Sequence, residues 1–116
     1  MRILVCGDRN WHNIGIIERE LRKFDKDTIV IHGDCRGADK LGAFVAERLG
    51  LRVKPFPAKW HIYKRGAGPV RNQQMIDEGR PELVLAFHEN ISESVGTIDM
   101  IKKAKRAGIK VVIVKG

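Results

Sequence analysis

The sequence has few cysteines and no long hydrophobic run, and both absences restrict what the protein can be. Its longest apolar stretches are strand-sized, whereas a membrane-spanning helix needs about 20 apolar residues, so no membrane partner is expected. The first residues, MRILVCG, have neither the apolar core nor the small-residue cleavage site of a secretory signal peptide. Without such a signal, the two cysteines, Cys6 and Cys35, are expected to be reduced thiols rather than a disulfide. Together these features predict a cytoplasmic protein.

Common nucleotide and metal motifs are also missing. No Walker sequence occurs, and no Gly-x-Gly-x-x-Gly follows the first apolar stretch. Gly66-Ala67-Gly68 comes closest, but it follows a long predicted loop rather than a strand. The four histidines are not spaced as His-x-x-x-His, and no Cys-x-x-Cys is present, so no metal site is predicted. We expect neither a conventional dinucleotide fingerprint nor a cofactor.

The overall composition is that of one folded domain. A chain of 116 residues with 43% hydrophobic residues is long and apolar enough for a single core, and it lacks the signature of a disordered protein. No repeat, low-complexity segment or linker divides it, so residues 1–116 are expected to form one domain.

The chain is strongly basic, with 22 Lys and Arg against 14 Asp and Glu and a net charge of +8. Such an excess favours anionic partners: nucleotides, other phosphates or nucleic acid. Much of the charge lies in helix-like stretches such as ERELRKFDKD and KKAKRAG, where a solvated face is an ordinary explanation. Composition alone leaves both interpretations open.

Apolar segments of two kinds alternate along the chain. Strand-like runs occupy residues 2–6, 28–32, 52–56, 82–87 and 110–114. Apolar residues at helical spacing predict helices over residues 14–24, 38–49 and 69–79. A last predicted helix contains Ile98, Ile101 and Ala104 and ends at Gly108. Five strands that alternate with four helices predict an α/β domain with a parallel sheet.

The segments that follow the strands carry most of the chemistry. In an α/β sheet the ligand site lies outside the carboxyl ends of the strands, and here those segments are 7–11, 32–39, 57–72 and 88–97. Glycine lets a backbone approach a ligand closely, and helix N-termini favour phosphate. Glycines fall at or shortly before the predicted helix starts, at Gly33, Gly37, Gly66, Gly68 and Gly96. The sequence therefore predicts an anion or nucleotide site at this edge of the sheet.

Several residues in these segments have two readings. Asp8 and Arg9 are candidates for ligand contact or for a surface ion pair, and the helix dipole by itself can explain Asp39. Trp11 and Trp60 can stack on a base or cover the end of the core. His32 and His88 end the second and fourth strands and are expected to be polar strand caps on either side of the first strand.

Taken together, the segments ILVCGDRNW, IVIHGDCRGAD, FPAKW, AGPVRNQQMID and LVLAFHENISESVGTIDM resemble the YspA-like family of the SLOG superfamily. The resemblance covers nearly the whole chain. It implies a single SLOG-like, Rossmann-like three-layer domain, with a five-stranded parallel sheet and helices on both faces. Members of the superfamily are related to the lonely-guy (LOG) phosphoribohydrolases and to DprA. They are thought to bind or sense nucleotide-derived ligands, and they are often homo-oligomers.

The resemblance also assigns residues to roles. Gly7 and Arg9 belong to the first ligand loop and residues 33–39 to the second, while Arg71-Asn72 and Gly96-Thr97 match conserved pairs of the LOG enzymes. The candidate ligand-binding residues are Gly7, Asp8, Arg9, Trp11, Gly33, Arg36, Gly37, Ala38, Asp39, Trp60, Gly68, Arg71, Asn72, Gly96 and Thr97.

The catalytic glutamate of the LOG enzymes falls at Met100, with Asp99 one residue earlier. A methionine cannot accept a proton. A shift of one position along a helix rotates the side chain by about 100°, so Asp99 is not an automatic substitute for the glutamate. Ligand binding or sensing is therefore the first hypothesis. The alternatives are a nucleotide N-glycosidic hydrolase that uses Arg71 and Asp99 or Asp39, and a nucleic-acid-binding module.

The sequence also suggests how the second loop works. We expect the backbone N–H groups of Gly37 and Ala38 to point at a phosphate, and Arg36 to add a mobile contact. Asp39 either bonds a ribose hydroxyl or anchors the loop. Arg71, expected to be exposed, approaches the same phosphate, so its replacement by alanine abolishes binding while the fold survives. Gly37→Val is expected to fill the space of the phosphate.

Overall fold

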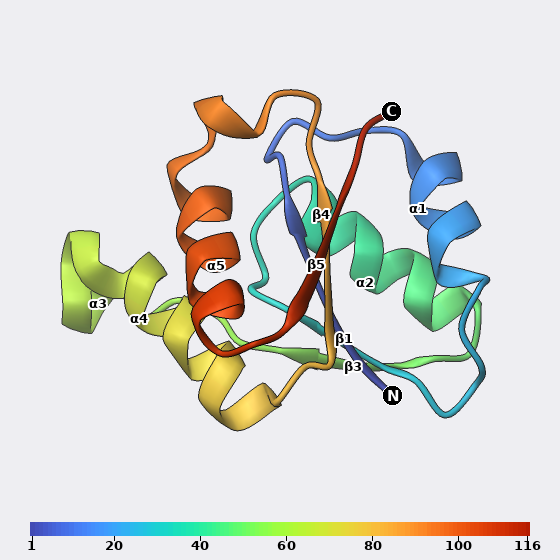
Figure 1. Cartoon of the computed structure of the whole chain (residues 1–116), viewed down its shortest axis with the longest axis horizontal. Coiled ribbons are helices and arrows are strands. Elements are labelled where there is room, and N and C mark those ends of the chain that lie inside the picture. The colour runs from blue at the N-terminus through green and yellow to red at the C-terminus, as the bar shows by residue number, and fades with distance from the viewer.

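Five parallel strands form one sheet in the order β3-β2-β1-β4-β5 (Figure 1). The computed structural model describes all residues, 1–116. The strands are β1 (Arg2–Gly7), β2 (Ile29–His32), β3 (Arg52–Pro55), β4 (Leu83–Phe87) and β5 (Lys110–Val114). The predicted five-stranded parallel sheet is confirmed, and the Pro-containing strand lies at an edge as expected.

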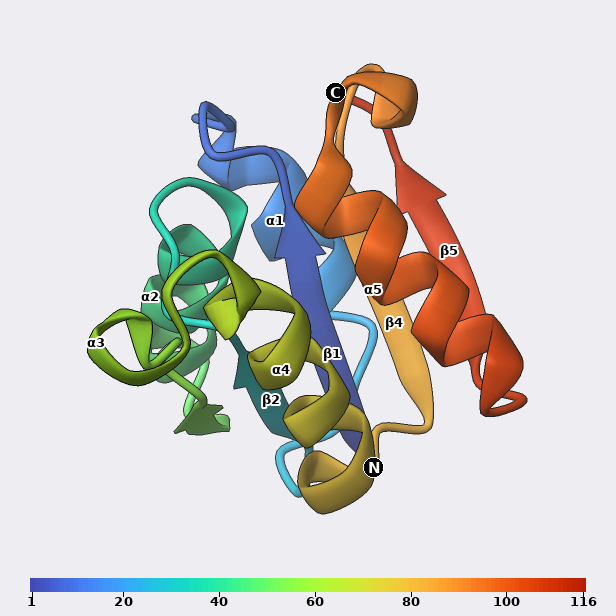
Figure 2. The same ribbon diagram turned by 90° about the vertical axis from the view of Figure 1, so that its left-hand side faces the viewer.

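Helices cover both faces of this sheet. On one face pack α1 (Ile14–Leu21) and α2 (Ala38–Arg48), and on the other pack α4 (Ala67–Gln74) and α5 (Val95–Arg106). Figure 2 shows α4 and α5 in front of the strands and α1 behind them. The three-layer, Rossmann-like arrangement therefore agrees with the sequence prediction. None of the helices has the length and apolar composition of a membrane span.

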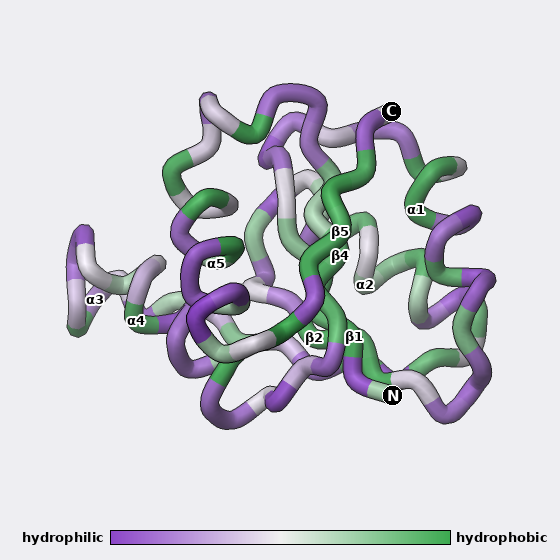
Figure 3. Tube along the Cα trace, viewed as in Figure 1, coloured by the Kyte–Doolittle hydropathy of each residue, from purple (hydrophilic) through white to green (hydrophobic).

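The alternation of side chains along β1 explains why this strand lies in the middle. Ile3 and Val5 belong to the core beneath α1 and α2, whereas Leu4 and Cys6 belong to the core beneath α4 and α5. A parallel strand that is buried on both faces must be apolar at every position. In Figure 3 the central strands are accordingly mostly hydrophobic, while the loops at the sheet ends are mostly hydrophilic.

The segment between β3 and β4 differs most from the prediction. Where the sequence suggested a long loop, the chain forms a short helix α3 (Trp60–Tyr63) and a 3-10 turn η1 (Lys64–Gly66). The predicted helix 69–79 begins earlier, at Ala67, and ends in a π-helical turn η2 (Met75–Gly79). Because α3 buries no residue, it has no apolar stripe from which a helix could be predicted. A second short turn, η3 (Ile91–Glu93), precedes α5.

The strand order creates a crevice beside β1. The chain steps from β1 to β2 and β3 on one side, and then returns to place β4 on the other side of β1. In such sheets ligands bind at the carboxyl ends of the two strands where the order reverses. Here that point lies between the ends of β1 and β4.

Candidate functional site

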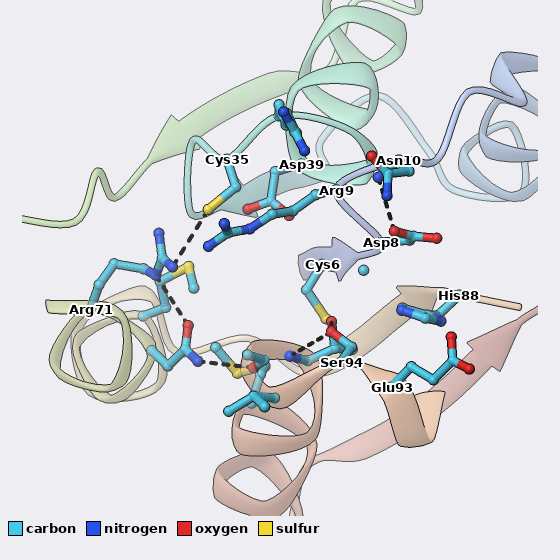
Figure 4. A pocket seen from close by; sticks show the side chains of 18 residues that line it. Cys6, Asp8, Arg9, Asn10, Cys35, Asp39, Arg71, His88, Glu93 and Ser94 are labelled. Carbon is cyan, nitrogen blue, oxygen red and sulfur yellow. Dashed lines mark hydrogen bonds between the residues drawn. The ribbon is translucent and has the colours of Figure 1, made fainter. Parts of the chain in front are cut away.

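A cavity of about 350 Å³ lies at this point, and we call it the switch pocket. Its size is within the range of small-molecule sites. The walls come from the loops after β1, β2 and β4, from α4 and from the start of α5 (Figure 4). The lining residues are Cys6, Gly7, Asp8, Arg9, Asn10, Cys35, Arg36, Asp39, Arg71, Asn72, Met75, His88, Glu93, Ser94, Val95, Gly96, Thr97 and Met100.

The pocket brings together most of the candidate residues from separate parts of the sequence. Those that line it are Gly7, Asp8, Arg9, Arg36, Asp39, Arg71, Asn72, Gly96 and Thr97. The remaining candidates are Trp11, Gly33, Gly37, Ala38, Trp60, Gly68 and Asp99, and they lie outside its walls.

Trp11 belongs to the core. Its side chain is buried, its ring centroid lies 5.7 Å from that of Phe87, and its indole N–H donates to the Asn13 carbonyl at 3.0 Å. Of the two roles predicted for Trp11, the structure supports covering the end of the core.

Gly37 and Ala38 pack against the loop after β1. The Ala38 N–H donates to the Asp8 carbonyl at 3.0 Å, so the prediction that this N–H points at a phosphate is wrong. A Cβ on Gly37 would overlap the backbone of Asp8 and Arg9. The space beside Gly37 is therefore filled by protein backbone, and the expectation that Gly37→Val would occupy the space of a phosphate is also wrong.

Asp39 lies beneath the pocket, and its carboxylate holds the loop after β2. Its Oδ2 atom accepts a hydrogen bond from the Gly33 N–H at 2.8 Å. Burial raises the pKa of this carboxyl to about 6, against the opposing effects of the Gly33 N–H and the Arg71 guanidinium. Of the two roles predicted for Asp39, the structure supports the anchor of the loop.

Arg71 is buried, with 8% of its surface exposed, so the prediction of an exposed arginine is wrong. The guanidinium donates to the Gly33 carbonyl, to Asn72 Oδ1 at 3.1 Å and to Cys35 Sγ at 3.6 Å. A Cβ on Gly33 would overlap this guanidinium, which explains the glycine there. Since Arg71 fixes a loop from beneath, its removal is expected to disturb the fold as well as the pocket.

The start of α5 is the helix N-terminus that opens into the pocket. Ser94 caps it, with Oγ accepting from the Thr97 N–H at 3.3 Å and lying 2.8 Å from Thr97 Oγ1. The N–H groups of Val95 and Gly96 have no acceptor within the chain. Unpaired N–H groups and the positive end of the helix dipole together favour an anion at this position.

Asp99 and Met100 occupy different surroundings on α5. The Asp99 carboxylate accepts from Lys103 Nζ at 2.6 and 2.7 Å and from Asn72 Nδ2 at 2.9 Å. Met100 is 1% exposed and lines the pocket. Met100, at the position of the glutamate in the LOG enzymes, therefore lines the cavity with a thioether. The neighbouring carboxylate of Asp99 is bound to Lys103 and Asn72 instead.

Trp60 and Gly68 lie together beyond the pocket. Trp60 is 51% exposed on α3, and a Cβ on Gly68 would lie 3.9 Å from the edge of its ring. Trp60 borders a second cavity of about 620 Å³, which we call the Trp60 hollow. It is lined by Arg9, Gly33, Asp34, Cys35, Arg36, Pro57, Ala58, Trp60 and Arg71.

The two strand-end histidines act as caps, as predicted. His32 Nδ1 accepts from the Asp34 N–H at 3.0 Å, and His88 Nδ1 accepts from the Asn90 N–H at 3.0 Å. Burial lowers the pKa of His32, which keeps Nδ1 free to accept.

Sequence reasoning favoured a strand cap over a ligand role for His88 and missed Ser94 and Glu93, and all three line the pocket. For Ser94 a signal exists, because a serine immediately before an apolar helical repeat is a strong N-cap candidate.

Comparison with known proteins adds one match. A family model described as YspA, cpYpsA-related SLOG family matches residues 1–63, just over half of the chain. The matched part includes the loops after β1 and β2, and thus Asp8, Arg9, Arg36 and Asp39 of the pocket. No curated protein matches the chain.

Proposed function

The chain belongs to the YspA, cpYpsA-related SLOG family, and on this premise we propose that it binds a nucleotide or a nucleotide-derived ligand in the switch pocket. One observation carries the proposal. At the topological switch point, Arg9, Arg36 and Arg71 from three different segments line the same cavity as the open N-terminus of α5. Cationic side chains and unpaired backbone N–H groups are the donors that bind phosphate in proteins.

The pocket offers separate groups for the phosphate and for sugar hydroxyls. The N–H groups of Val95 and Gly96 and the exposed arginines Arg9 and Arg36 are suited to the phosphate. Arg71 holds the second loop in position through the Gly33 carbonyl.

Carboxylates supply the acceptors that ribose hydroxyls need. Asp8 and Glu93 line the same cavity, and Figure 4 shows Arg9, Asp8 and Glu93 arranged around it. The switch pocket therefore offers donors for a phosphate together with acceptors for a sugar.

Hydrolysis receives less support from the geometry. The carboxylate of Asp99 is paired with Lys103 and Asn72 outside the cavity. That of Asp39, the other candidate acid or base, lines the cavity but is buried and holds the Gly33 N–H. Met100, which does line the cavity, has no proton to exchange. Binding or sensing is thus favoured over N-glycosidic cleavage.

The test is ligand-induced stabilisation of the purified protein. We expect the thermal midpoint to rise with at least one member of a panel that contains ribose 5-phosphate, AMP, ADP-ribose and a cyclic dinucleotide. A ligand at a hundredfold its Kd stabilises the native state by about 2.7 kcal/mol. Titration calorimetry of that ligand then gives the affinity.

Two arginine variants locate the site. Arg36→Ala removes an exposed pocket side chain and is expected to weaken binding about tenfold or more, with little loss of stability. Arg106→Ala removes an exposed arginine at the end of α5, outside the pocket, and is expected to leave binding unchanged. An unchanged midpoint with every compound would refute the proposal.

A further inference from the structure

The Trp60 hollow continues from the switch pocket rather than lying apart from it. The two cavities share four lining residues, Arg9, Cys35, Arg36 and Arg71. Three of the four are arginines, so a cationic ridge borders both cavities: Arg9 and Arg36 are exposed on it, and Arg71 is buried and bound to the Gly33 carbonyl. A ligand whose phosphates lie on this ridge can extend into either side.

The far side of the hollow is apolar and aromatic. Pro57, Ala58 and Trp60 line it, and about half of the Trp60 surface is exposed. An exposed tryptophan leaves a large apolar area in water, which is unfavourable unless something covers it.

The ring lies outside the hydrophobic core of the fold. The helix that carries Trp60 buries none of its residues, and Trp60 belongs to neither hydrophobic core cluster. The neighbouring Ile62 and Tyr63 are also exposed, but neither lines the hollow. Trp60 is the residue of α3 whose ring borders the cationic cavity.

We infer that the Trp60 hollow is the nucleobase subsite of the same binding site. The base stacks on Trp60, the phosphates contact the exposed Arg9 and Arg36 on the ridge, and the remaining part of the ligand enters the switch pocket. Stacking of a base on an aromatic ring contributes appreciably to affinity and suits any base. Because a cavity lies on each side of the ridge, the ligand class is a nucleoside diphosphate that carries a second ribose or sugar.

This inference rests on the proposed function, and its test separates the two. ADP-ribose and ribose 5-phosphate are titrated against the wild type and against the variants Trp60→Ala, Trp60→Phe and Ile62→Ala. Ribose 5-phosphate has no base, so it reports on the switch pocket alone. Ile62→Ala is the matched control, because Ile62 is an exposed neighbour on the same helix that lines neither cavity.

We expect ADP-ribose to bind more tightly than ribose 5-phosphate and to quench tryptophan fluorescence. Trp60→Ala should weaken ADP-ribose about tenfold or more and leave ribose 5-phosphate unchanged, since only the stacked base is lost. Trp60→Phe should recover most of the affinity, and Ile62→Ala should behave as the wild type.

Other results overturn the inference. If ribose 5-phosphate binds but Trp60→Ala leaves the affinity for ADP-ribose intact, the base subsite is refuted and the proposed function stands. If Trp60→Ala weakens both ligands equally, or lowers the molar mass in light scattering, Trp60 serves the fold or a contact between copies instead. If no phosphate compound binds the wild type, the proposed function fails, and the base subsite fails with it.

Discussion

Asp39 and Arg71 carry opposite charges beneath the switch pocket, and both act on the peptide backbone around Gly33. Asp39 accepts from the Gly33 N–H and Arg71 donates to the Gly33 carbonyl. Asp39 therefore satisfies the buried Gly33 N–H, while Arg71 and the Cys35 thiol, at 3.9 Å, both donate to the Gly33 carbonyl. The loop that presents Arg36 is held by these contacts.

The raised pKa of Asp39 gives a prediction for pH and stability. The pKa of the Asp39 carboxyl is about 6 in the native state and near 3.8 in the unfolded chain. Between pH 4 and pH 6 the native state therefore holds a proton that the unfolded state has lost. Stability should fall across this interval by about 3 kcal/mol and level off above it.

Urea denaturation from pH 4 to pH 7 measures this fall. Asp39→Asn, whose amide oxygen can still accept from Gly33, should lack it, whereas Asp27→Asn, at an exposed aspartate outside this loop, should keep it. His32 has a lowered pKa and acts in the opposite direction, since acid favours its unfolded form, but it is present in all three proteins. Identical pH profiles for the wild type and Asp39→Asn would contradict the assignment.

At the scale of elements, the two helix starts near the pocket differ in what covers them. The start of α2 is closed by the loop after β1, through the bond from Ala38 to Asp8 and the close approach at Gly37. The start of α5 remains open at Val95 and Gly96, and no atom lies within 4 Å of a Cβ on Gly96. Packing between loops thus closes the start of α2 and leaves the start of α5 open.

A pair of glycines compares a closed position with an open one. Gly37 and Gly50 both have a positive φ, +79° and +78°, but Gly37 has a ψ of −130° and packs against backbone, whereas a Cβ on Gly50 meets nothing within 4 Å. Gly50→Ala should therefore cost only the strain of the left-handed backbone, about 1–2 kcal/mol. Gly37→Ala should cost about 1–3 kcal/mol more, because the loop after β1 must move and because this backbone conformation is nearly restricted to glycine.

Denaturation midpoints of the two variants provide the measurement. Equal losses of stability in the two variants would mean that the loop after β1 moves at no measurable cost. Its packing against the start of α2 would then not stabilise the fold.

On the scale of the whole molecule, the positive charge is unevenly distributed. Seven of the Lys and Arg residues lie between Glu47 and Asp77, a stretch with no acidic residue. It includes the edge strand β3, where Arg52 and Lys54 disfavour pairing with another sheet. It also includes α3 and Arg71, so the charge reaches the two cavities from one side of the molecule.

The assembly state is predicted from the family resemblance, and the surface is compatible with self-association. Large apolar side chains are exposed at several points, including Phe44, Val95 and Ile113. We expect light scattering coupled to size exclusion to give at least twice the 13.1 kDa of one chain. A mass of one chain at every protein concentration would contradict this.

The sequence by itself determined the order of the elements and the edge of the sheet at which the candidate pocket lies. Strand and helix patterns are local, because the period of apolar residues reports directly on which side of an element is buried. Residues 3–6 and 83–87 are apolar throughout, which is typical of strands covered on both faces. Parallel strands then bring Asp8, Arg36 and Thr97 to one edge of the sheet.

Only the tertiary structure decided what each side chain does there. Trp11 is buried and Trp60 is exposed, although both stand in similar loops of the sequence, because burial depends on which distant segment packs against a ring. Arg71 is buried because the Gly33 carbonyl lies within its reach, 38 residues away along the chain. For the same reason the Ala38 N–H, which was expected to bind a phosphate, donates instead to the Asp8 carbonyl of a distant loop. Such contacts join residues that are remote in sequence, and no local pattern encodes them.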